Sequence, residues 1–345
     1  MKKIYWIIAG LLVFAGIAAC SKDAVEEAFT GFQQPANFPA PAYHFSTNTV
    51  TKDGFILGRK LFYEKLLSAN NTISCGSCHI QTSAFTHHGH SVSHGIFDRM
   101  GTRNSPPIMN LAWNSSFMWD GGIFDLDLQA IAPITNHVEM DETMDNVLAK
   151  LRSTPPYPSL FNAAFGSEEI TGSRFLKALS QFMLLCESSN SKYDSVMRHE
   201  GGKTFSAEEQ QGYTLFRQKC ATCHAEPLFT DNSFRNNGIA PSMVNDEGRY
   251  LVTQDARDRY RFKVPSLRNL AYTAPYMHDG RFFTLEAVLD HYSGQVQSTP
   301  NLDPVLQQGT TPGIAMSAEE KARIISFLNT LNDRSLITNP KLSEQ

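Results

Sequence analysis

The sequence is short of several features that would place it in common classes of protein. Charged residues make up only 19% of its 345 residues and the formal net charge is -4, so it lacks the basic face that nucleic-acid binders normally show. Beyond the first twenty residues, no apolar run approaches the roughly 20 residues that a membrane-spanning helix requires. The alternating pattern of strands is also rare. These absences favour a mostly α-helical protein with long loops, whose length is typical of about two domains.

The first twenty residues differ from the rest in composition. Two lysines precede an apolar run that ends in GIAAC, which closes at Cys20. This order predicts a signal peptide over residues 1–19, because the run is too short for the alternative, a membrane anchor. GIAAC also resembles a lipoprotein processing box. That resemblance implies a lipid on Cys20, a tether over residues 20–40, and an exported lipoprotein of the periplasm or cell envelope that meets the membrane only through its lipid.

Cysteine is scarce, and its six occurrences divide clearly. One is Cys20, and another, Cys186, lies alone on an apolar helical face, where we expect a buried core thiol. The other four belong to two copies of the motif C-x-x-C-H. The two copies comprise Cys75, Cys78 and His79, and Cys220, Cys223 and His224.

The motif C-x-x-C-H is the attachment signature of c-type haem. Two thiols on one helical turn can bond the two vinyl groups of the porphyrin, and the adjacent imidazole can then reach the iron. Zinc knuckles or a disulfide framework are the alternatives, but a zinc site would need further Cys or His residues at tetrahedral spacing. The sequence therefore predicts two covalently bound haems, with His79 and His224 as iron ligands.

The chain has the character of a loose internal duplication. Each motif follows a stretch that contains a glycine and then Leu-Phe, in LGRKLF and in QGYTLF. We predict one haem domain over residues 41–198 and a second over residues 199–340, with a linker around residues 198–206. Capping-box spacings predict helix starts at Ser206 and Ser317, and the second of these helices is expected to close the chain.

Several longer motifs carry a resemblance to a known family. They are RNSP and WDG in the first half, and VPSLRNLAYTAPYMHDG and TLEAVLDHYSG in the second. With these motifs the chain resembles the bacterial dihaem cytochrome c peroxidases and their relative MauG, over nearly the whole mature length. The resemblance implies two c-type cytochrome domains. It also implies reduction of hydrogen peroxide at the first, peroxidatic haem, with electrons that the second haem receives from a small cytochrome c or cupredoxin.

The resemblance assigns three residues to catalysis. Trp119 matches a tryptophan that relays electrons between the haems, and Gln129 and Glu139 match the pair at the open face of the peroxide-reactive haem, near a haem-facing Pro133. Independently of the family, cleavage of the O–O bond needs a proton moved from the near to the far oxygen, which a carboxylate can do. Without this match to the family, Glu139 would be interpreted as a solvated loop residue and Trp119 as a core aromatic residue.

The resemblance also implies a calcium ion between the domains, with Asn104, Thr273 and Pro275 as ligands. The distal ligand of the first haem is less well defined. Classical members carry a histidine in the loop after the first motif, and this loop is histidine-rich. Its members are His87, His88, His90 and His94. His94 is nearest the expected place, although its distance to RNSP is two residues longer, and surface histidines are the alternative.

At the second haem most family members have a methionine as sixth ligand, whereas this chain has Tyr292, as MauG does. Met277 and His291 compete for this position, and His278 is expected to support a ligand rather than to be one. A tyrosine packed in the core is the alternative, because Leu285, Val288 and Tyr292 share a helical face.

Two other functions stay open at this stage. One is a MauG-like reaction, in which peroxide is used to oxidise residues of a partner protein. The other is a dihaem electron-transfer cytochrome, which would need two six-coordinate irons and would leave Glu139 without a role. A homodimer is also left open.

Overall fold

The computed structural model describes residues 29–345, so the predicted signal peptide and Cys20 lie outside the described residues. Among the described residues, the first half forms seven α-helices. They are α2 (Lys52–Phe62), α3 (Cys75–Cys78), α4 (Leu126–Gln129), α5 (Ile131–Thr135), α6 (Met144–Ser153), α7 (Tyr157–Phe165) and α8 (Gly172–Met183). Between them run long loops with short 3₁₀ turns, which confirms the predicted mixture of helices and loops.

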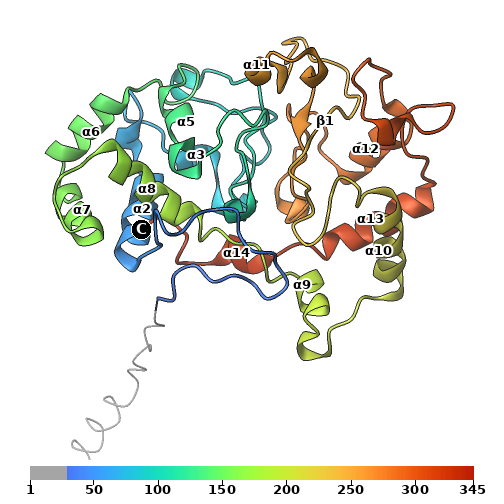
Figure 1. Cartoon of the computed structure of the whole chain (residues 1–345), viewed down its shortest axis with the longest axis horizontal. Coiled ribbons are helices and arrows are strands. Elements are labelled where there is room, and N and C mark those ends of the chain that lie inside the picture. The colour runs from blue at the N-terminus through green and yellow to red at the C-terminus, as the bar shows by residue number, and fades with distance from the viewer. Residues whose placement is uncertain (1–28) are drawn as a thin grey trace, which may run out of the picture. The chain divides into compact units, whose positions relative to one another are not determined.

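The second half has the same character. Its helices are α9 (Lys192–Met197), α10 (Ala207–Lys219), α11 (Tyr250–Thr253), α12 (Leu285–Asp290), α13 (Ala318–Asn329) and α14 (Arg334–Thr338). Sheet structure in residues 29–345 is limited to one antiparallel pair, β1 (Phe234–Arg235) with β2 (Phe262–Lys263), apart from isolated bridges. Within residues 31–345, α2 and α6–α8 gather on one side and α10, α12 and α13 on the other (Figure 1).

Helix starts follow local sequence signals. Ser206 caps α10 and Ser317 caps α13, each with a complete capping box, as predicted. Cys186 is fully buried, which confirms the core thiol. The prediction that the helix capped by Ser317 closes the chain is wrong, because one further helix, α14, follows α13. The local signal for α14 is weak, since this five-residue helix buries only Leu336.

Each half is built on a helix crossing at a glycine. A Cβ atom on Gly58 of α2 would lie 1.9 Å from the carbonyl oxygen of Ala178 in α8, and one on Gly212 of α10 would lie 1.9 Å from that of Arg323 in α13. Only glycine permits so close a backbone approach. The same crossing thus occurs before each haem motif, which explains why both LGRKLF and QGYTLF contain a glycine.

The two halves are joined by more than the linker. Residues 31–345 cluster as one compact unit, so the boundary near residue 198 stays a prediction. After α14 the chain returns to the first half, where Gln81 donates to the carbonyl oxygens of Leu336 and Asn339 at 3.1 and 2.8 Å, and Tyr63 donates to that of Leu342 at 2.8 Å. Figure 1 shows α14 between the two groups of helices.

The end of the predicted tether is packed against α9 and the residue that follows it. Asn37 donates to Asp194 at 2.9 Å and accepts from Arg198 at 3.0 Å, and the neighbouring Phe38 is buried. Asp194 in turn forms a fully buried bidentate ion pair with Arg268. No helix within residues 29–345 combines the length and the apolar character needed to pass through a membrane.

Candidate haem sites

Both C-x-x-C-H motifs form a single helical turn. In the first, α3 is capped by Ser74, and the amide of His79 donates to the carbonyl oxygen of Cys75 at 2.9 Å. In the second, the amide of His224 donates to the carbonyl oxygen of Cys220 at 3.0 Å, directly after α10. This turn brings two thiols and one imidazole together, which is the arrangement that covalent haem attachment requires.

The two motif histidines are held in the same way. His79 Nδ1 lies 2.8 Å from the carbonyl oxygen of Phe85, and His224 Nδ1 lies 3.1 Å from that of Phe229. Both phenylalanines have a left-handed backbone, with φ of 61° and 57°. A carbonyl can only accept, so Nδ1 carries the hydrogen and Nε2 keeps its lone pair. This is the tautomer that an iron ligand needs, with its second nitrogen anchored. Burial lowers the pKa of both imidazoles, which keeps them neutral.

The alternatives to haem find no support in residues 29–345. The five cysteines in that range are all free thiols, and no group of three or more His, Cys, Asp or Glu residues there is arranged to hold a metal ion. The motifs therefore lack the third and fourth ligands of a zinc site and the pairing of a disulfide framework. Free thiols beside a histidine with an available Nε2 fit haem c.

A large cavity opens beside the second motif. It encloses about 1590 Å³ between protein atoms, part of it open to solvent. Its wall includes Cys220, Cys223, His224, Met277 and Tyr292. Most of the other lining side chains are apolar, as in Leu267, Leu270, Leu285, Val288, Leu289, Ile324 and Leu328. An apolar cavity with a few polar groups suits a porphyrin, whose faces are apolar.

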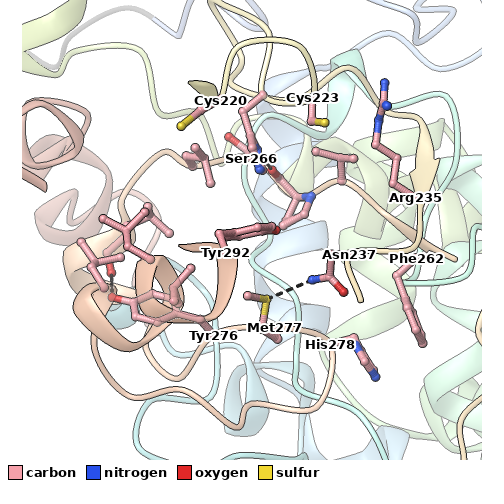
Figure 2. A pocket seen from close by; sticks show the side chains of 18 of the residues that line it. Cys220, Cys223, Arg235, Asn237, Phe262, Ser266, Tyr276, Met277, His278 and Tyr292 are labelled. Carbon is pink, nitrogen blue, oxygen red and sulfur yellow. Dashed lines mark hydrogen bonds between the residues drawn. The ribbon is translucent and has the colours of Figure 1, made fainter. Parts of the chain in front are cut away.

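Figure 2 shows the two candidate sixth ligands in this cavity. Tyr292 and Met277 extend into the same space, with Asn237 beside Met277 and the thiols of Cys220 and Cys223 above them in the view. Tyr292 lies in a π-helical turn over His291–Gln295 that follows α12, so the expected uniform α-helical face ends at Asp290. Burial raises the pKa of Tyr292 to about 12, and a hydrogen bond from Asn237 opposes this shift.

The histidines near this cavity have other partners. His291 is buried, and its Nε2 lies 3.0 Å from the carbonyl oxygen of Asn237. His278 stacks on Phe262, with ring centroids 3.7 Å apart, and burial lowers the pKa of His278 to about 4. His278 therefore lines the cavity as a neutral, stacked ring.

Glu139 lies near the first motif. Its charge raises the pKa of both Cys75 and Cys78, although burial contributes more to each shift. Asn136 donates to Glu139 Oε1 at 2.8 Å. Burial raises the pKa of Glu139, and this hydrogen bond opposes the increase. A desolvated carboxyl beside a haem attachment motif is suited to hold and release a proton.

Gln129 is the last residue of α4, and its amide donates to the sulfur of Met118 at 3.7 Å. Met118 precedes Trp119, so the predicted amide and the predicted relay residue lie in neighbouring segments. The carbonyl oxygen of Pro133 accepts from the amide of Met140 at 3.2 Å, which ties α5 to the segment that carries Glu139.

Trp119 lies where the two halves meet. It lines the cavity of the second motif although it belongs to the first half, and its indole donates to the carbonyl oxygen of Asn104 at 2.8 Å. The carbonyl oxygen of Trp119 accepts from the amide of Lys263 in β2 at 2.7 Å. The next residue, Asp120, forms an ion pair with Arg103. Trp119 is thus fixed by both halves, through its indole by the first and through its backbone by the second.

The three predicted calcium ligands come together. Asn104, Thr273 and Pro275 all line the same cavity, and Asn104 and Thr273 are buried. The Asn104 amide nitrogen donates to the carbonyl oxygens of His90 and Ser91 at 3.3 and 3.1 Å. These bonds use the nitrogen of the Asn104 side chain and not its oxygen, and oxygen is the ligand atom that calcium prefers.

The histidine-rich loop forms a ring cluster. His87 and His90 are stacked with centroids 4.2 Å apart, and His90 Nδ1 lies 3.4 Å from His94 Nε2. His94 Nδ1 lies 2.9 Å from Asp98 Oδ1, while its carbonyl oxygen accepts from the Cys78 thiol at 3.5 Å. The backbone of His94 is therefore at the first motif, but both of its ring nitrogens face other side chains.

The polar residues of the cavity wall that sequence reasoning missed include Asn237, Lys263 and Arg235. Arg235 is paired with Asp231 and Asp303 at 2.7 and 3.0 Å. Lys263 could have been found by aligning RNSPPIMNLAW with FKVPSLRNLAY, because it occupies the position of Asn104 in that repeat. Asn237 follows no motif, and only the fold brings it to Tyr292.

Comparisons with known proteins relate the chain to dihaem peroxidases and MauG. The family model described as di-haem cytochrome c peroxidase matches residues 52–202. The methylamine utilization protein MauG of Methylorubrum extorquens is 34% identical over 338 residues, which cover 95% of this chain and 92% of that protein. The cytochrome c551 peroxidase of Nitrosomonas europaea is 33% identical, with 80% and 78% covered. The crystal structure of a MauG-like protein associated with microbial copper homeostasis has a TM-score of 0.79 and 33% identity, with 92% and 99% covered.

Proposed function

This chain belongs to the family of dihaem cytochrome c peroxidases and MauG, and we propose on that basis that it is a dihaem c-type peroxidase that reduces hydrogen peroxide to water. The observation that carries the proposal is the repeated anchoring of His79 and His224, each with Nδ1 on a carbonyl and Nε2 left for iron. In this reaction one peroxide takes up two electrons and two protons and yields two water molecules.

We assign acid-base catalysis to Glu139. A haem bound at His79 would supply the iron that binds peroxide and takes part in cleaving its O–O bond. The Glu139 carboxylate accepts the proton of the near oxygen and returns it to the far oxygen, which leaves as water. Burial raises the pKa of Glu139, so the carboxyl holds this proton more readily than an exposed one. Gln129 would hold peroxide or water through its amide.

We assign electron relay to Trp119. Its place at the meeting of the two halves, on the wall of the second cavity, supports this role. Electrons would enter at the second haem from a small cytochrome c or cupredoxin and pass through the indole to the first. His94 would serve as a distal ligand of the first haem only after its ring leaves Asp98 and His90.

A calcium ion is the further cofactor that we propose. The convergence of Asn104, Thr273 and Pro275 on one cavity wall supports it. Oxygen atoms of these residues would bind the ion together with water. Because Asn104 also accepts from Trp119, calcium would stiffen the relay.

The remaining proposals concern location and assembly. A lipid on Cys20, after removal of residues 1–19, would hold an exported protein at the cell envelope. Covalent haem c and the lipoprotein-like GIAAC support export. A homodimer is proposed as one state of assembly, and two haem domains over residues 41–198 and 199–340 as the internal organisation.

A second candidate function is MauG-like oxidation of a partner protein. Tyr292 on the cavity wall, in place of the usual methionine, favours it. The experiment that separates the two functions compares substrates of the holoprotein. A peroxidase turns over peroxide with a reduced cytochrome or cupredoxin at a steady rate. A MauG-like enzyme would show little such turnover but would consume peroxide with a protein substrate. No peroxide reaction with either would leave the electron-transfer cytochrome.

The proposed cofactor content has a direct test. Protein made with a c-haem maturation system should carry two covalent haems by intact mass and should keep them through acid-acetone extraction. Cys75→Ala and Cys220→Ala should each weaken attachment at one site only. A single haem, or bound zinc, would contradict the proposal.

A further inference from the structure

Two side chains compete for one position beside the second motif. Tyr292 and Met277 line the same cavity as His224, and each carries an atom that can bind iron. His224 Nδ1 is engaged by two carbonyl oxygens, those of Phe229 and Pro265 at 3.1 and 3.2 Å, so its Nε2 is the atom available to the iron. The question is what determines whether the phenol oxygen of Tyr292 or the thioether sulfur of Met277 would bind the iron together with His224.

Asn237 contacts both competitors. Its amide nitrogen donates to the sulfur of Met277 at 3.5 Å, and the bond is drawn in Figure 2. Its side chain lines the same cavity as Tyr292 and lies close enough to lower the pKa of the Tyr292 hydroxyl. The bond to Met277 fixes the orientation of its thioether at Asn237, while the second lone pair of the sulfur stays available to iron.

Asn237 is fixed through both its side chain and its backbone. Its side-chain oxygen accepts from the amide of Ile239 at 3.4 Å, and its carbonyl oxygen lies 3.0 Å from His291 Nε2. The following Gly238 has φ of 68°, and a Cβ there would lie 2.5 Å from Val296. Asn237 is therefore anchored to the same π-helical segment that carries Tyr292.

The contact has a counterpart in the first half. Met118 and Met277 occupy equivalent positions, before WDG and before HDG, and both have a left-handed backbone, with φ of 69° and 74°. In the first half the amide of Gln129 donates to the sulfur of Met118 at 3.7 Å. A methionine sulfur held by a side-chain amide is thus a repeated feature of the two sites.

We propose that Asn237 is a positioning residue that selects Tyr292 over Met277 as the sixth ligand of the second haem, by holding the Met277 sulfur in reserve and the Tyr292 hydroxyl in place. This inference rests on the proposed function, because it requires a haem at His224. It identifies Asn237 as the residue that determines which side chain binds the iron. It also makes Met277 an alternative ligand that the fold keeps from binding.

The test is the ligand of the second haem in Asn237→Leu holoprotein. Leucine keeps the branched shape of asparagine, with a larger volume, and removes its donors. In the wild type, the ferric near-infrared spectrum should lack the sulfur-to-iron band of methionine ligation. In Asn237→Leu this band should appear, and the reduction potential of one haem should rise, because a neutral thioether replaces an oxygen ligand. The double variant Asn237→Leu, Met277→Leu should lose the band again.

A matched control changes Met118, which occupies in the first half the position that Met277 occupies in the second. Met118→Leu should leave the spectrum and the potential of the second haem as in the wild type. A methionine band in the wild type, an Asn237→Leu spectrum identical to that of the wild type, or a band that survives in the double variant would each overturn the inference. Haem content, measured by intact mass, distinguishes failure of this inference from failure of the proposed function. Loss of the second haem from wild-type protein would contradict the proposed function itself. Two retained haems in Asn237→Leu show that the variant has folded.

Discussion

The amide of Lys263 donates to the carbonyl oxygen of Trp119 at 2.7 Å, across the boundary between the two halves of the chain. The equivalent bond joins the amide of Asn104 to the carbonyl oxygen of His278, also at 2.7 Å. Lys263 and Asn104 occupy the same place in the repeated motif, as do Trp119 and His278. Each half therefore contributes one donor and one acceptor to a reciprocal pair. The proposed relay residue is held by this pairing.

Trp119→Phe should separate electron relay from the peroxide reaction. Phenylalanine fills most of the space but is harder to oxidise and cannot donate to the carbonyl oxygen of Asn104. We expect turnover with a reduced donor to fall by about tenfold or more, equivalent to about 1.4 kcal/mol on a barrier. Stopped-flow spectra should show that peroxide still reacts with the first haem. Equal loss of both steps would mean that Trp119 acts only through the structure.

Glu139→Gln should suppress the reaction with peroxide. The amide keeps the shape of the side chain and can still contact Asn136, but it cannot shuttle a proton. We expect the second-order rate constant for peroxide to fall by about 10²–10⁴-fold, with both haem spectra nearly unchanged. Glu187→Gln is the matched control, because burial also raises the pKa of Glu187 and its partner is Ser189. Wild-type rates in Glu139→Gln would favour the electron-transfer cytochrome.

Lys263 should make stability depend on alkaline pH. Its ammonium group donates to the carbonyl oxygen of Ser116 at 2.8 Å, and burial lowers the pKa of Lys263 from 10.5 to about 8. Between these values the unfolded chain binds more protons than the folded protein, so stability attributable to this residue rises as pH increases from about 8 to 10.5. Below pH 8 the full cost of burying the charge is present.

The measurement is the difference in the free energy of unfolding between wild type and Lys263→Met, from pH 7 to 10.5. This difference should shift in favour of the wild type by at most about 1.4 kcal/mol per pH unit above pH 8. Lys263→Arg is the control, because arginine stays charged over the whole range and should show no such gain. A pH-independent difference for Lys263→Met would show that the ammonium group titrates normally.

Deletion of residues 334–345 should loosen the first half of the molecule, although these residues end the second. The deletion removes the partners of Gln81 and Tyr63, and each such hydrogen bond contributes about 0.5–1.5 kcal/mol. It also removes the buried Leu336 and Leu342, whose burial contributes about 1.5–3 kcal/mol each. Hydrogen exchange should increase in α2 and near Gln81. Deletion of residues 343–345 is the control, and exchange that increases only in the second half would contradict the prediction.

Much of this arrangement follows from local sequence. The haem motifs, the capped starts of α10 and α13, and the duplication all depend on residues a few positions apart, so they could be predicted. The reciprocal backbone hydrogen bonds of Asn104 and Lys263 join segments far apart in the chain. Because backbone atoms make these bonds, they require no particular residue type and cannot be recognised in the sequence. Asn237 was missed for a similar reason, because its neighbours Met277 and Tyr292 are brought to it only by the fold. The π-helical turn after α12 was also missed, since apolar spacing in this region fits an α-helix equally well.

If Cys20 carries a lipid, as we propose, the packing of Asn37 against Asp194 and Arg198 sets how far the enzyme could travel from a membrane. Sixteen residues lie between Cys20 and Asn37, and the seventeen residue steps from one to the other would reach about 60 Å if fully extended. With a lipid on Cys20, diffusion of the folded part would therefore be confined to a thin layer above the membrane surface rather than extending through the whole volume. An electron donor or protein substrate anchored to the same membrane would meet it at a high local concentration, whereas a freely diffusing one would have to enter that layer.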